Sequence, residues 1–127
     1  TTPVFVGSPN LGAALVSAAN TNRDGTGTIV TVFTAGAEGS RVHRIRVKAI
    51  QTTTAGMVRI YLHSSAAFFL YREIPVTAIT VSASAEGFAY ELQMPNEDAI
   101  VLSSGWSVRA STHNAESFNV FVEGGDY

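Results

Sequence analysis

The sequence predicts an all-β fold: an antiparallel two-sheet β-sandwich, jelly-roll-like, with about eight strands. Three observations predict it. Runs rich in β-branched and aromatic residues recur along the chain, several of them alternate between apolar and polar residues, and clusters of glycine, proline and asparagine separate them. No segment has a convincing amphipathic helical period. Because 127 residues are the size of one ordinary domain, we expect a single hydrophobic core.

The beginning of the chain is the least regular part. Residues 1–27 are predicted to form an N-terminal arm and the first short strands, and residues 28–127 the sandwich core of the same domain. The runs 4–6 and 13–18 are candidate strands, although the second also fits a helical turn. The polar cluster 20–27 is typical of a turn. The alternative is an arm that becomes ordered on a neighbouring subunit, because chain ends are easily left undocked.

The next two strands form a predicted hairpin around the turn 35–40. The run 28–34 is dense in β-branched residues. In the strand after the turn, Ile45, Val47 and Ala49 share the inward face because successive strand side chains point to opposite sides. The outward face of that strand has three cations, which are Arg44, Arg46 and Lys48.

The run 57–63 is the next predicted strand, and we expect it to pair antiparallel with the strand before it. Its outward side chains are Met57, Arg59, Tyr61 and His63. Further strands are predicted at 68–74, 76–82 and 88–94, with Pro75 and Pro95 at strand ends because proline cannot donate to a sheet. The last strands are predicted at 100–102, 106–111 and 118–123. The predicted core consists of Ile45, Val47, Val58, Ile60, Leu62, Trp106, Val108, Phe118, Val120 and Val122.

Composition limits the classes of partner. Charged residues make up only 14% of the chain and apolar residues 46%, so the surface suits lasting contact with other proteins. The formal net charge of −2 gives the chain no positive electrostatic field that would attract nucleic acid. No apolar run approaches the roughly 20 residues of a membrane span, and no signal peptide opens the chain. We expect a chain made in a cytoplasm that binds neither nucleic acid nor membrane.

The sequence offers no recognisable catalytic, cofactor or metal site, and we expect no enzyme. Cysteine is absent, and no serine lies in a Gly-x-Ser-x-Gly elbow. The histidines lack metal-binding spacing, and strand parity points His43 inward and His63 outward. The third histidine, His113, follows a predicted strand. We interpret all three as ordinary surface or rim residues.

Two surface features stand out. The cations Arg44, Arg46 and Lys48, continued across the sheet by Arg59, are candidate protein-contact residues. A solvated sheet face is one interpretation, and pairing with carboxylates of another subunit is the other. The aromatic group consists of Tyr61, Phe68, Phe69, Tyr71 and Trp106. Those of its members that face outward suggest an interface or a sugar-binding surface.

The stretches 41–49 and 52–60 resemble small structural proteins of tailed bacteriophages, and 105–112 and 118–126 strengthen the resemblance. It covers residues 21–127 and implies a β-sandwich virion component, such as a capsid cement or decoration protein made in the host cytoplasm. The implied partners are the major capsid protein or other virion subunits, and further copies of the chain, with a trimer favoured. The alternatives are a tail or neck protein, or a carbohydrate-binding module. No functional residue is transferred from the family.

Overall fold

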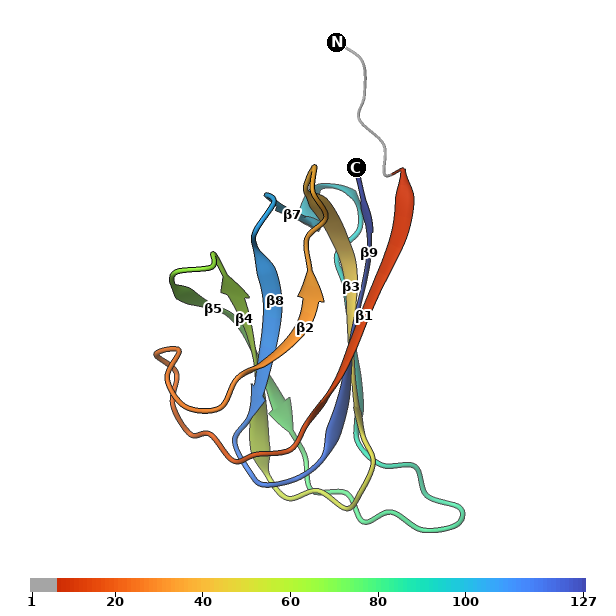
Figure 1. Ribbon diagram of the computed structural model, residues 1–127. Coiled ribbons are helices and arrows are strands. Elements are labelled where there is room, and N and C mark those ends of the chain that lie inside the picture. Colours follow the sequence, from red (N-terminus) through yellow and green to blue (C-terminus); the bar gives the residue numbers. More distant parts are fainter. Residues whose placement is uncertain (1–6) are drawn as a thin grey trace.

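The computed structural model describes residues 7–127, which form two antiparallel sheets packed face to face (Figure 1). We call the sheet β1-β9-β3-β6, with β7 paired to β3, sheet A, and the sheet β2-β8-β4-β5 sheet B. This confirms the predicted antiparallel sandwich, and the strand orders of the two sheets are those of a jelly roll. The elements are β1 Ser8–Val16, β2 Val30–Thr34, β3 Ser40–Ala49, β4 Gly56–His63, β5 Phe68–Val76, β6 Ala89–Gln93, a 3-10 helix Asn96–Asp98, β7 Ile100–Leu102, β8 Ser107–Thr112 and β9 Phe118–Asp126.

The first described strand belongs to the sandwich. β1 pairs with β9 of the same chain along its whole length, from Ser8 opposite Asp126 to Val16 opposite Phe118. The predicted strand at 13–18 is therefore a strand and not a helical turn, although it ends at Val16. The predicted strand at 4–6 lies outside the described residues. The described part of residues 1–27 thus adds one edge to sheet A.

The predicted hairpin around 35–40 and the expected pairing of the two strands around 52–55 are both wrong. β2 lies in sheet B, where it pairs with β8 and not with β3. β3 lies in sheet A between β9 and β6, whereas β4 lies in sheet B between β8 and β5. The connection between them crosses from one sheet to the other, so Ile45 and Ile60 enter the core from opposite sheets. Alternation assigns an inward face to each strand, but it does not say which strand is its neighbour.

Three other local predictions also fail. β5 continues through Pro75 to Val76 because it is an edge strand, where a missing N–H costs no ladder hydrogen bond. The run 76–82 is not a strand and makes isolated bridges, such as Thr53 to Ile79. His43 is exposed because β3 has a register shift opposite β9 between Val42 and Arg44, which changes the parity.

The core lies between the two sheets. Eight of the ten predicted core residues are buried, and Leu62 and Trp106 are partly buried and packed against the others. Sequence alternation missed Val42, Phe33 and Ile74, which are also buried. The predicted core is thus largely confirmed, and the observed core contains more residues than alternation indicated.

Truncating a core residue tests this burial. Ile45 is fully buried, so Ile45→Ala should lower the free energy of unfolding by about 2 to 5 kcal/mol. Val101→Ala is the matched control, because Val101 is 67% exposed and should lose less than about 0.5 kcal/mol. Urea denaturation followed by tryptophan fluorescence measures both. Equal effects would contradict the inward assignment of β3.

A carboxylate joins three strands near the end of the chain. The Asp126 carboxylate accepts hydrogen bonds from the Ser40 hydroxyl at 2.5 Å and from the Asn10 amide at 2.9 Å. These two hydrogen bonds lower the pKa of Asp126 below its usual value. The ionised Asp126 carboxylate therefore connects β9 to β3 and β1 by hydrogen bonds.

The lowered pKa of Asp126 predicts an acid-sensitive contribution to stability. This contribution is fully present above the unfolded-state pKa of about 3.9 and is lost as the pH falls through the lower folded-state pKa. Asp126→Asn should therefore be less stable than the wild type near pH 7, and the difference should shrink below about pH 4. Urea titrations over this pH range measure it. A difference that stays constant would exclude the ionised carboxylate as its source.

Candidate functional site

The predicted cations of β3 lie on the outer face of sheet A. The register of the sheet places each of them in a row with one residue of β9 and one of β6. Arg44 lies between Glu123 and Gln93, and Arg46 lies between Phe121 and Glu91. The third row is Asn119, Lys48 and Ala89. The structure thus brings Arg44, Arg46 and Lys48 together as one stripe.

Carboxylates of the same sheet face pair with this stripe. Arg44 contacts Glu123 at 2.8 Å and Glu91 at 3.2 Å. Arg46 lies 3.8 Å from Glu123, and Lys48 contacts Glu86 at 2.6 Å. Hydrogen bonds help to lower the pKa values of Glu86 and Glu91, the first mainly through Lys48 and the second mainly through Gln93. The stripe is therefore close to neutral, and partner carboxylates would have to compete with these pairs.

Apolar side chains lie beside the stripe. Along β1, Leu11 and Leu15 are 64% and 52% exposed, and Ala13 between them is also exposed. Ala13 lies opposite Phe121, which lies next to Arg46 on the other side. β1 has no charged residue, although edge strands of monomers usually have charges that discourage association. We call the outer face of β1, β9, β3 and β6 the contact face.

The contact face is hollowed. A groove of about 590 Å³ opens on it, between β9 and β6 and over the middle of β3. This volume is within the usual range for pockets that hold a ligand. The groove is lined by Leu11, Arg46, Val47, Lys48, Ala89, Tyr90, Glu91, Phe121 and Glu123.

Arg59 does not belong to the stripe, which corrects the sequence prediction. It lies on β4 in sheet B, and its side chain is only 2% exposed. The segment between β1 and β2 crosses the outer face of sheet B and covers it (Figure 1). Parity pointed Arg59 outward correctly, but it could not show that another part of the chain covers that face.

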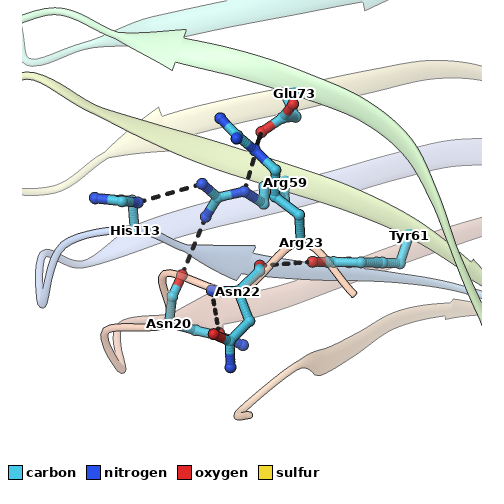
Figure 2. A network of polar contacts seen from close by, with 7 residues as sticks. All are labelled: Asn20, Asn22, Arg23, Arg59, Tyr61, Glu73 and His113. Carbon is cyan, nitrogen blue, oxygen red and sulfur yellow. Dashed lines mark hydrogen bonds and ion pairs between the residues drawn. The ribbon is translucent and has the colours of Figure 1, made fainter. Parts of the chain in front are cut away.

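Arg59 is the centre of a buried polar network (Figure 2). Its guanidinium donates to Glu73 Oε2 at 3.1 Å, to the carbonyl of Asn20 at 3.1 Å and to Nδ1 of His113 at 3.3 Å. Arg23 donates to the same oxygen of Glu73 at 2.7 Å. These hydrogen bonds hold the pKa of Glu73 below its usual value, with Arg23 as the largest cause. The network thus connects the covering segment to β4, β5 and β8.

Hydrogen bonds within the covering segment also stabilise its conformation. The Asn20 side chain donates to the carbonyls of Thr26 and Thr28, and Asp24 accepts from Thr26. Gly25 and Gly27 have positive φ angles of 87° and 84°, which favour glycine. The predicted turn at 20–27 is therefore an ordered loop. Its dense Asn, Asp and Gly content was the one sequence signal that could have pointed to a cover over Arg59.

The histidines do not converge. His113 accepts from Arg59, whereas His63 packs against the ring of Phe68 at 4.2 Å between centroids. Burial and the nearby Arg109 lower the pKa of His63. Within residues 7–127 no group of three histidine or acidic side chains could hold a metal ion. In the same residues no helix is long and apolar enough to cross a membrane.

The aromatic group is divided between buried and exposed members. Tyr61 points to the outer face of sheet B, as predicted, but it is fully buried there because the covering segment lies over it and its hydroxyl donates to the carbonyl of Asn22. Phe69 is 52% exposed and stacks on Trp106, with 5.9 Å between centroids and 16° between planes. Tyr71 is 40% exposed on the same edge strand. An aromatic surface therefore exists at the edge of sheet B.

Comparison with protein-family models gives no match, and comparison with curated protein sequences gives none either. The resemblance to phage structural proteins therefore depends on the residue pattern alone.

Proposed function

We propose that this chain is a structural protein of a virion, of the capsid cement or decoration type, that acts by binding other protein subunits through its contact face. The observation that favours this function is the contact face itself. It combines exposed leucines with a stripe of cations that neighbouring carboxylates already neutralise. Such a face suits lasting contact with another protein surface.

The architecture adds support by analogy. Jelly-roll sandwiches are common among viral capsid proteins, and also among lectins. A cement protein binds the assembled shell and not its free subunits, so it shifts the equilibrium towards the intact particle. The proposed partners are the major capsid protein or other virion subunits.

Particle stability tests this function. Particles without the protein should lose their DNA at a lower temperature or chelator concentration than complete particles, and adding the purified protein should restore resistance. Equal resistance with and without the protein would refute the cement role. Counting the copies per particle separates a head protein, present in hundreds, from a tail or neck protein, present in a few.

The contact face makes a specific prediction for this assay. Arg46 has a 45% exposed side chain and only a long 3.8 Å ion pair, so Arg46→Glu should leave folding intact. Its reversed charge faces Glu91 and Glu123, and the protein should bind particles on the order of tenfold more weakly. Arg72→Glu is the matched control, because it makes the same change of charge on the exposed edge strand of sheet B. Equal binding by both variants would exclude the contact face.

A carbohydrate-binding module is the second candidate, and the stacked pair of Phe69 and Trp106 favours it. One face of the Phe69 ring is covered by Trp106, and half of the side chain is exposed, as a sugar platform requires. A glycan array with the wild type and Phe69→Ala tests it. Absence of glycan binding by the wild type would end this candidate.

A further inference from the structure

The groove on the contact face has room for a short peptide segment. Its volume of about 590 Å³ equals roughly 20 water molecules at about 30 Å³ each. Phe121 and Leu11 lie on one side of it and Ala89 on the other. The groove is therefore suited to apolar side chains.

The charges of the groove do not select an anion. Lys48 is paired with Glu86, and Arg46 has Glu91 in its row and lies 3.8 Å from Glu123. The aliphatic stems of Arg46 and Lys48 add apolar surface while their charged ends stay partnered. A charged ligand would have to break these pairs, whereas an uncharged segment would leave them in place.

The chain has an uncharged apolar segment at its beginning. Residues 1–6 are Thr-Thr-Pro-Val-Phe-Val and contain no charged side chain. Val4, Phe5 and Val6 have the β-branched and aromatic character that packs on the face of a sheet. This neutral composition complements a groove whose own charges are balanced. Six residues extend over at most about 20 Å, enough to fill such a groove.

The position of β1 favours the groove of another copy over that of the same copy. The Gly7 amide donates to the carbonyl of Asp126 at 2.8 Å, so the pairing of β1 with β9 extends to Gly7. Leu11 lies in the opposite direction along β1, away from residues 1–6. The segment would have to reverse at once to reach its own groove. Exchange between copies needs no reversal, and it closes into a ring in a cyclic oligomer such as a trimer.

We propose that the groove on the contact face binds residues 1–6 of a second copy of this chain. This inference rests on the proposed function, because it specifies how copies of an assembly protein join. The segment links each sandwich to its neighbour, and Phe5 packs against Phe121 and Leu11.

Light scattering on the full-length chain is the first test. We expect an oligomer, with a trimer near 40 kDa, which is three times the chain mass of 13.4 kDa. Phe5→Asp and Leu11→Asn should each weaken association on the order of tenfold or more. Val101→Asn is the matched control, because Val101 is 67% exposed and Leu11 64%, but Val101 is not in the groove. An oligomer that survives both groove variants would overturn the proposal.

A peptide titration gives an independent readout. The peptide Thr-Thr-Pro-Val-Phe-Val added to full-length Phe5→Asp should shift the amide resonances of Leu11, Lys48 and Phe121, and a peptide with serine for valine and phenylalanine should not. Absence of these shifts overturns the proposal, as does a monomeric wild type in which Phe5 contacts its own groove. Particle binding separates this failure from that of the proposed function, since a chain without arm exchange can still stabilise shells.

Discussion

Arg59→Ala should lower the free energy of unfolding by about 3 kcal/mol, the upper end of the cost of leaving a buried polar group without its hydrogen bond. The Arg59 side chain is 2% exposed and makes three hydrogen bonds, to Glu73, to the Asn20 carbonyl and to His113. Its removal leaves the Asn20 carbonyl without a donor under the covering segment. It also leaves a cavity where the guanidinium lay.

Arg23→Ala is the control for this experiment. Arg23 donates to the same oxygen of Glu73, but its side chain is 63% exposed. An exposed ion pair contributes about 0 to 1 kcal/mol, so this variant should remain close to the wild type. Urea denaturation measures both variants. If both variants lost similar free energy of unfolding, the stabilisation would come from pairing with the charge of Glu73 and not from the burial of Arg59.

Gly12→Ala should destabilise the fold by about 3 kcal/mol, at the upper end of the usual cost of overpacking. A Cβ at Gly12 would lie 2.1 Å from the carbonyl oxygen of Val32 and 2.9 Å from Cα of Phe33. Both are backbone atoms of β2, which cannot move aside as a side chain can. The corner where β1 of sheet A approaches β2 of sheet B would have to open.

Gly7→Ala is the matched control, because its nearest neighbour would be the Asp126 carbonyl oxygen at an ordinary 3.7 Å. Thermal unfolding of both variants measures the difference. The Gly12 variant should also become less protected from hydrogen exchange along β2. A change at Gly12 that costs no more than the change at Gly7 would mean that the two sheets separate freely at this corner.

The residue pattern predicted the strands better than their partners. Alternation along β3, β4, β8 and β9 identified most of the core, because a strand side chain needs only its own parity to choose a face. Pairing depends on residues far apart in the chain. β3 therefore lies beside β9 rather than β4, as no local pattern could show.

In the candidate site, too, parity predicted which face a residue is on but not which residues it contacts. Arg44, Arg46 and Lys48 share a face by parity alone, and the structure places them together. Their pairing with Glu86, Glu91 and Glu123 and the groove beside them needed the register of three strands. The exposed leucines of β1 were missed, because this strand has no charged residue to mark its outward face.

Side-chain parity and composition are local properties, and they were enough to predict the all-β class, the single core, the inward sets of the alternating strands and the cationic stripe. The exposure of His43 by a shift of register, and the burial of Arg59 and Tyr61 under the covering segment, depend on the folded arrangement of the chain. An outward strand side chain meets either water or another part of the chain, and which of these it meets depends on contacts between distant segments.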